Sequence, residues 1–382
     1  MGSAGSVTWL QKLSEQLNVD VDWMDPAYTL SMPIKPHDMT SNQGWVHEQM
    51  CNPVNEELFK QVVKEYKDQG WLAIYTRMAV LMSKANIDNI QGRVLLQTLP
   101  SNAYDTQKTL EHARAYAKEF DSVGVSKDRF CIKIPSTGPA LNACPILLEE
   151  GIRTLGTTLF SVHQAIAASQ AGCLYISPYY NGESHPSVRG IRRSHPPTEV
   201  RAHDEQELWP KSDDPALLHP MSPRLVQILE TYKRLYKETG KEQPFLKNAS
   251  FISPQEAMAA GELGCQSATI SHQVLTQLAN LPYDGAKQPG EGVLKPEHPY
   301  RNAAPTPERL KKIAQTDPLI GPNWDGKLSK FDIDYLANGG VELDKANEAD
   351  PETEKRLREA LALFVAAEKR SQAKIEEAMK SG

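Results

Sequence analysis

Residues 129–183 constrain the fold of this chain more than any other stretch. Three short apolar runs, FCIKIP at 130–135, RTLGTTLF at 153–160 and CLYISPYY at 173–180, alternate there with two segments of helical character. Alternating strands and helices are typical of parallel sheets and barrels, in which catalytic side chains gather at the carboxyl ends of the strands. The stretch therefore predicts an α/β protein with its functional groups at one end of the strands.

Lys133 lies inside the run FCIKIP, between apolar neighbours. A buried lysine costs stability unless it is paired or neutral, and burial lowers the pKa of an ammonium group toward neutrality. A neutral amine can form a Schiff base with a ketone. A lysine on a strand is more often an edge residue or a side chain that extends to solvent, so the catalytic and the structural interpretation both stay open at this point.

The same alternation continues along most of the 382 residues. Seven strands can be assigned, and the eighth is expected near 43–47 or merged into 71–75. We therefore predict one (β/α)8 TIM-barrel domain over 1–382, with the barrel at about 17–283 and extra helices at the N- and C-terminal ends. Outside the regular pattern we expect an irregular insert at 183–222, a loop-rich region at 284–350 and a C-terminal helix at 351–379.

Charge and cysteine content exclude several classes of protein. The chain has 42 Lys and Arg against 48 Asp and Glu, interspersed, with a net charge of -6, which gives no footprint for nucleic acid or an anionic membrane. Five cysteines without CxxC spacing indicate buried thiols in a reducing compartment, and we expect a cytoplasmic protein. No apolar run has the length of a membrane span. The start MGSAGS fits the myristoylation pattern at Gly2, but small residues are common there.

Several segments together resemble the transaldolase family, class I Schiff-base enzymes built on a (β/α)8 barrel. The resemblance covers nearly the whole chain and rests on DWMD (22–25), DMTSN (38–42), GRV (92–94), DRFCIKIPST (128–137), EEGIRTLGTTLFSVHQAIAASQAG (149–172), ISPYY (176–180), NASF (248–251) and GCQSATIS (264–271). Each segment alone would be weak, whereas the set is specific.

The resemblance assigns roles to individual residues. It places the Schiff-base lysine at Lys133, the acid/base aspartate at Asp22 and a threonine of the proton relay at Thr157. It also implies substrate contacts for Asn42 with its neighbours Thr40 and Ser41, and for Ser177 and Ser250. The family uses neither a metal nor an organic cofactor, and we expect none here. His163, His185 and His272 lack the spacing of metal ligands.

Two departures from the transaldolase pattern concern the catalytic water. Gln97 stands where transaldolases carry a glutamate, and Tyr179 stands where they carry a phenylalanine. Both substitutions resemble the fructose-6-phosphate aldolase branch of the family, in which Gln, Thr and Tyr hold the water. Because glutamine cannot exchange a proton as glutamate does, the acid/base work would pass to Tyr179 or Asp22.

Further departures concern phosphate. Transaldolases bind the sugar phosphate with two arginines, at positions that here hold Asn181 and Ile252. Either the substrate is not phosphorylated and Asn181 contacts it directly, or a nearby cation compensates, for which the candidates are Arg189, Arg192, Arg193 and Lys247. Gln43 also replaces the proline that usually follows the loop asparagine.

The predicted function is therefore cleavage or formation of a C–C bond in a hydroxyketone or ketose, through an enamine on Lys133. The partners are a small sugar or hydroxyketone donor and an aldehyde acceptor, and the sequence leaves open whether the chain forms a homodimer. Two alternatives remain: a conventional transaldolase of the pentose phosphate pathway, and a sugar-binding barrel that has lost turnover.

Overall fold

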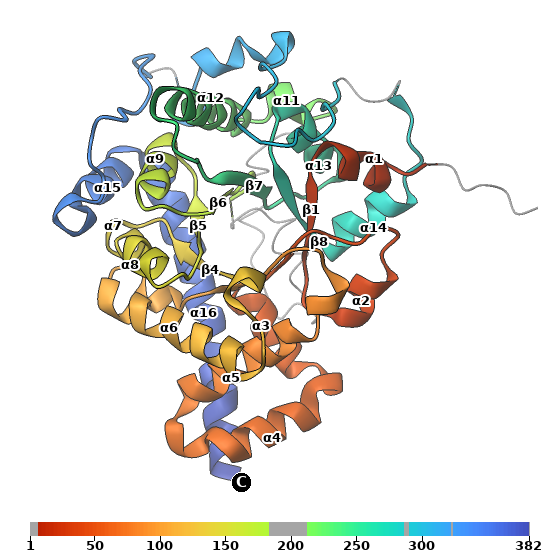
Figure 1. Cartoon of the computed structure of the whole chain (residues 1–382), viewed down its shortest axis with the longest axis vertical. Coiled ribbons are helices and arrows are strands. Elements are labelled where there is room, and N and C mark those ends of the chain that lie inside the picture. The colour runs from red at the N-terminus through yellow and green to blue at the C-terminus, as the bar shows by residue number, and fades with distance from the viewer. Residues whose placement is uncertain (1–6, 183–211, 286–289, 322–323, 382) are drawn as a thin grey trace, which may run out of the picture.

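The computed structural model describes residues 7–182, 212–285, 290–321 and 324–381. Its centre is a closed barrel of eight parallel strands that pair in chain order (Figure 1). The strands are β1 Asn18–Asp22, β2 Met39–Thr40, β3 Val94–Gln97, β4 Phe130–Pro135, β5 Thr154–Leu159, β6 Tyr175–Pro178, β7 Phe245–Ala249 and β8 Ser267–Ser271. The predicted (β/α)8 TIM barrel is confirmed.

Helices surround the barrel (Figure 1). Several begin at a capping side chain: Asp105 accepts a hydrogen bond from the backbone of α6, and Ser253 does the same for α13, which has proline at its first position. The helices are α1 Trp9–Gln16, α2 Pro26–Ser31, α3 Gln43–Cys51, α4 Glu56–Tyr66, α5 Trp71–Lys84, α6 Thr106–Ser122, α7 Gly138–Leu141, α8 Ala143–Glu149, α9 Val162–Gln170, α11 Pro215–Leu218, α12 Ser222–Thr239, α13 Pro254–Leu263, α14 His272–Asn280, α15 Ala337–Ala349 and α16 Pro351–Ser381.

The eighth strand is not where the sequence predicts it. Both expected positions, 43–47 and 71–75, are helical and fall in α3 and α5. The missing strand is β2, only two residues long, which pairs with β1 through Met39 and with β3 through Met39 and Thr40. So short a strand carries no periodic signal, and only its two neighbours define it.

Outside the barrel, the structure matches the expected C-terminal helix, differs in part from the expected loop-rich region and does not describe most of the expected insert. Within the expected loop-rich region 284–350, α15 is a regular helix after a kink at Asn338–Gly340. The predicted C-terminal helix is present as α16, which in Figure 1 runs past α3 and α5 to the C-terminus near α4. Residues 183–211 of the expected insert lie outside the described residues, and with them the predicted candidates His185, Arg189, Arg192 and Arg193; Gly2 also lies outside.

One face of α16 covers part of the barrel mouth. Leu357, Leu361 and Phe364 are buried in one cluster with Phe160 and Tyr179, which follow β5 and β6. Core packing is the expected role of this face. The long helix therefore closes one side of the barrel end at which the predicted site lies.

Candidate active site

Lys133 lies on β4 with 4% of its surface exposed. Its register partners are Gln97 on β3 and Leu155 on β5, so Gln97 is its direct neighbour across the sheet. The Nζ atom donates a hydrogen bond to the backbone oxygen of Ser41, at 2.8 Å. The lysine is therefore a buried interior group, as predicted, and not an edge residue.

Asp22 ends β1 and has two hydrogen-bond donors. Thr40 Oγ1 donates to Oδ1 at 2.6 Å, and the indole Nε1 of Trp45 donates to Oδ2 at 3.0 Å. Both carboxylate oxygens are thus fixed by side chains from the end of β2 and the first turn of α3. Ser41, between these two elements, accepts from Lys133, so the segment 40–45 contacts both predicted catalytic groups.

The predicted substrate contacts in this connection are partly occupied by the protein itself. The hydroxyl of Ser41 donates to the Leu95 oxygen at 2.8 Å. Asn42 caps α3, since its Oδ1 accepts from the backbone nitrogens of Gly44 and Trp45. Among the described residues its amide nitrogen makes no hydrogen bond, which is compatible with a contact to a ligand. Substrate binding by Thr40, Ser41 and Asn42 stays a prediction.

Gln97, Thr157 and Tyr179 are the residues expected around a water, and all three are buried. Thr157 Oγ1 and Tyr179 Oη lie 3.0 Å apart, and the ring of Tyr179 meets Phe160 edge-on. Gln97 is 2% exposed, yet neither side-chain atom of its amide finds a hydrogen-bond partner among the described residues. Buried polar atoms are nearly always satisfied, so an unpaired amide beside Lys133 is suited to hold water or substrate.

Ser177 and Ser250, the two serines predicted to contact substrate, differ in their local structure. Ser177 is buried on β6. Ser250, directly after β7, has φ +66°, a conformation that costs a non-glycine residue about 1–3 kcal/mol. Its buried hydroxyl has no hydrogen-bond partner in the described part of the chain. Strain and an unpaired hydroxyl together mark Ser250 as a functional candidate.

Asn181 does not occupy a free ligand-binding position. It is fully buried, and its Nδ2 donates to the Ser250 oxygen at 2.8 Å and to Glu256 Oε2 at 2.7 Å. Its Oδ1 lies 3.4 Å from His219 Nε2. Burial raises the pKa of Glu256 to about 7, although the bonds from Ile252 N and Asn181 oppose this. These contacts favour a structural role for Asn181, and its contact with substrate stays a prediction.

Lys247 does not replace the missing arginines. It is fully buried, with Nζ 2.8 Å from a carboxylate oxygen of both Asp20 and Asp38. Burial raises the pKa of Asp20 to about 6. Burial would raise the pKa of Asp38 too, but the Lys247 ammonium and His37 hold it well below its usual value. Lys247 therefore serves as the counter-ion of two core carboxylates.

One group of side chains in the described residues has the donor types of a metal site. Asp20, His37 and Asp38 offer ligand atoms within 4.8 Å of one another. Lys247 already supplies a positive charge between the two carboxylates, at hydrogen-bond distance from each. The arrangement is that of a satisfied ion cluster, because the ammonium balances the charge that a cation would balance.

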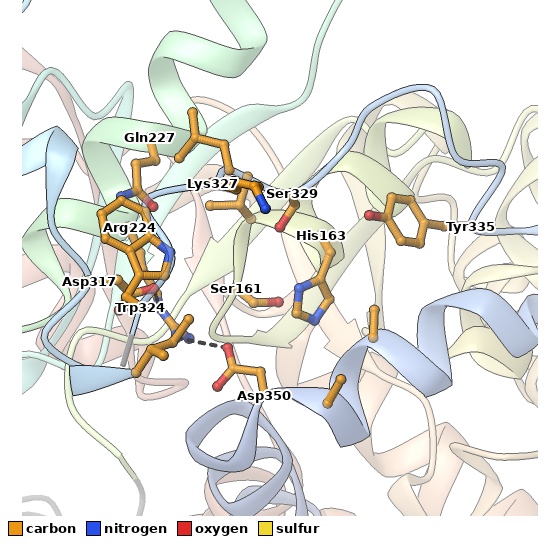
Figure 2. Close-up of a pocket in the computed structure, with 15 residues that line it drawn as sticks. Ser161, His163, Arg224, Gln227, Asp317, Trp324, Lys327, Ser329, Tyr335 and Asp350 are labelled. Atoms are coloured by element: carbon orange, nitrogen blue, oxygen red, sulfur yellow. Dashed lines mark hydrogen bonds and ion pairs between the residues drawn. The ribbon is translucent and has the colours of Figure 1, made fainter. Parts of the chain in front are cut away.

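A pocket of about 220 Å³ lies outside the barrel, between α9, α12 and α15 (Figure 2). Its buried Arg224 pairs with Asp317 at 3.0 Å and with Asp350 at 2.8 Å, and donates to the Phe160 oxygen. His163, left as structural by the sequence, lines this pocket and bonds to Asn347. Arg224 thus anchors the backbone at Phe160, whose ring packs against Tyr179.

Sequence reasoning missed two contributors to the site. Trp45, in a stretch expected to hold a strand, gave no signal, because a tryptophan in a regular element is ordinarily a core residue. Gln43, noticed only as a replaced proline, donates from Nε2 to the oxygens of Gln97 and Thr98 at 3.0 and 2.9 Å. It therefore anchors the start of α3 to the end of β3. A glutamine at a position expected to be buried was the one available signal.

No helix among the described residues has both the length and the apolar character needed to cross a membrane.

Comparison with known proteins agrees with this geometry. The family model described as transaldolase/fructose-6-phosphate aldolase matches residues 23–317, starting directly after Asp22. A transaldolase of Synechocystis is 27% identical over 341 residues, which cover 87% of this chain and 72% of that protein. A transaldolase of Allorhizobium ampelinum is 29% identical over 270 residues, 69% of this chain and 75% of that protein. The chain therefore belongs to the transaldolase/fructose-6-phosphate aldolase family and is an enzyme of the transaldolase/aldolase class.

Proposed function

We propose that the chain is a class I aldolase that cleaves or forms a C–C bond in an unphosphorylated hydroxyketone, through a Schiff base on Lys133. The observation that carries the proposal is the environment of this lysine. It is 4% exposed, hydrogen-bonded to Ser41 and paired in register with Gln97, whose amide is unpartnered in the described residues. A buried amine beside unsatisfied polar atoms suits a covalent ketone site.

The first half of the reaction uses Lys133 and Asp22. The neutral amine of Lys133 adds to the ketone carbon, and loss of water gives an iminium. The C3–C4 bond then breaks, and its electron pair moves toward the iminium to give an enamine. Asp22 takes the proton of the C4 hydroxyl, and the C4 fragment leaves as an aldehyde. With Thr40 and Trp45 holding its two oxygens, Asp22 is oriented for this transfer.

The second half decides between aldolase and transferase. In the aldolase direction the enamine carbon takes a proton, water adds to the resulting iminium, and the free ketone leaves Lys133. Tyr179 and Thr157, 3.0 Å apart, and the unpaired amide of Gln97 are suited to hold that water and to pass its proton. A transferase would instead let a second aldehyde capture the enamine.

An unphosphorylated substrate follows from the charge at the predicted phosphate end. The two positions for arginine hold Asn181 and Ile252, and both donate to the buried Glu256 carboxyl. Lys247 is committed to Asp20 and Asp38. An acidic group where the family places guanidinium groups disfavours a phosphate dianion.

The conventional transaldolase remains the second candidate, because both relatives carry that name. Two measurements separate the possibilities. Borohydride reduction with a hydroxyketone should label Lys133, and a label without cleavage of any ketose would favour the sugar-binding alternative. Cleavage of fructose should exceed that of fructose 6-phosphate in kcat/KM and should proceed without an acceptor. A strict requirement for erythrose 4-phosphate would overturn the aldolase proposal.

A further inference from the structure

The indole of Trp45 is directed at the carboxylate of Asp22. Its Nε1 lies 3.0 Å from Oδ2, while Thr40 Oγ1 lies 2.6 Å from the other oxygen. Trp45 is 3% exposed, so this hydrogen bond is shielded from competing water. An indole N–H can donate but cannot accept, so its partner must supply the lone pair. A hydrogen bond to a charged acceptor is roughly twice as strong as a neutral one.

The orientation of the indole is fixed on two sides. Its backbone lies in the first turn of α3, where Asn42 Oδ1 accepts from the backbone nitrogen of Trp45 at 3.2 Å. Gln43 anchors the same turn to the end of β3. The first turn of α3 is therefore capped by Asn42 and tied to the barrel by Gln43.

Aromatic rings hold the other side of the indole. Trp23 meets Trp45 edge-on at 5.0 Å between ring centroids and lies over His272 at 4.2 Å. His272 lies 6.2 Å from Trp45 and begins α14, after β8. Rings from three separate strand ends thus pack around the bond to Asp22. Such packing keeps a rotamer in place, which is what a precisely oriented donor requires.

We infer that Trp45 is a positioning residue for Asp22: its N–H holds Oδ2 so that the carboxylate is aligned to take the proton of the substrate hydroxyl. The inference rests on the proposed function and deepens it. Trp45 donates to Asp22, whereas Lys133 donates to the backbone oxygen of Ser41. Losing the donor should therefore slow C–C cleavage while leaving Schiff-base formation unchanged.

The test compares Trp45→Phe with Trp23→Phe. Trp45→Phe keeps an aromatic ring and removes the donor, whereas Trp23→Phe disturbs the same rings and keeps both donors to Asp22. For Trp45→Phe we expect kcat for ketose cleavage to fall about ten- to a hundredfold, with KM within about twofold. Trp23→Phe should lose less than about threefold. Borohydride labelling of Lys133 should match the wild type in both.

Two further variants make the test specific. Thr40→Val removes the other donor at nearly constant shape and should lower kcat in the same way. In an Asp22→Asn background, Trp45→Phe should cost nothing further, because its effect passes through that carboxylate. Equal losses in the two tryptophan variants, an additive loss in the Asp22→Asn background, or full activity of Trp45→Phe would each overturn the inference. Absent labelling of wild-type Lys133 would instead overturn the proposed function, and the inference with it.

Discussion

The phenolic oxygen of Tyr179 lies 3.0 Å from Thr157 Oγ1. Tyr179 directly follows β6 and Thr157 lies on β5, so the contact joins two neighbouring strands at the barrel mouth. Phe160 packs edge-on against the Tyr179 ring, and Leu361 and Phe364 of α16 complete its surroundings. The hydroxyl pair is thus held by a rigid apolar wall. A pair of hydroxyls so fixed can exchange a proton with one water, which is the basis of the first prediction.

Replacing Tyr179 by Phe together with Gln97 by Glu should move the enzyme from ketone release toward transfer. Without the phenol the water loses its proton partner, so release of free ketone should fall about a hundredfold or more. Trapping by an added aldehyde should then take a larger share of the enamine. The measurement is the ratio of free ketone to transfer product. Tyr66→Phe on α4 is the matched control, and an unchanged ratio in the double variant would refute the roles assigned here.

Glu256 should make stability depend on pH. Burial raises the pKa of Glu256 to about 7 in the folded state. The folded state then binds more protons than the unfolded state between pH 5 and 7, so the free energy of unfolding falls as pH rises through this range, by about 2 kcal/mol. Glu256→Gln keeps the hydrogen-bond acceptor for Asn181 and cannot titrate.

Urea unfolding at pH 5 and pH 7 compares the two proteins. The drop in stability from pH 5 to pH 7 should be smaller in Glu256→Gln by about 2 kcal/mol. Equal pH dependence in the variant and the wild type would show that Glu256 is not the titrating group.

Lys247 should be essential for stability. Removing it leaves Asp20 and Asp38 buried without their counter-ion, and breaking a buried ion pair costs about 3–5 kcal/mol. Lys247→Met should therefore lower the free energy of unfolding by that amount in urea denaturation. Lys241→Met, at an exposed position, should change it by less than about 0.5 kcal/mol. A loss below about 1 kcal/mol in Lys247→Met would contradict the counter-ion role.

Ile252→Arg should improve the use of phosphorylated sugars. The substitution restores a guanidinium at a position where transaldolases bind phosphate, and a charge-assisted hydrogen bond contributes about 1.5–3 kcal/mol. We expect KM for fructose 6-phosphate to fall about tenfold or more, with little change for fructose. Ile252→Met controls for the change in side-chain shape. A parallel change for both sugars would show that this position does not face the phosphate.

The sequence by itself determined the barrel and was enough to predict its chemistry. Apolar runs of four to eight residues between amphipathic helices have few packing solutions, and the buried Lys133 in one of them pointed to imine chemistry. Such local patterns can be recognised in one sequence without knowledge of the structure. They failed at β2, because two residues carry no period and only pairing with β1 and β3 makes them a strand.

Only the tertiary structure decided which polar groups meet. Trp45 and Asp22 are 23 residues apart, and Lys247 and Asp20 are 227 apart, yet each pair shares a hydrogen bond. The spacing of residues along the sequence does not predict the contacts that form when the barrel closes. For the same reason only the folded chain shows that Lys247 pairs with Asp20 and that Asn181 donates to Glu256. The choice between a free and a satisfied polar group depends on burial and partners, which the folded chain alone supplies.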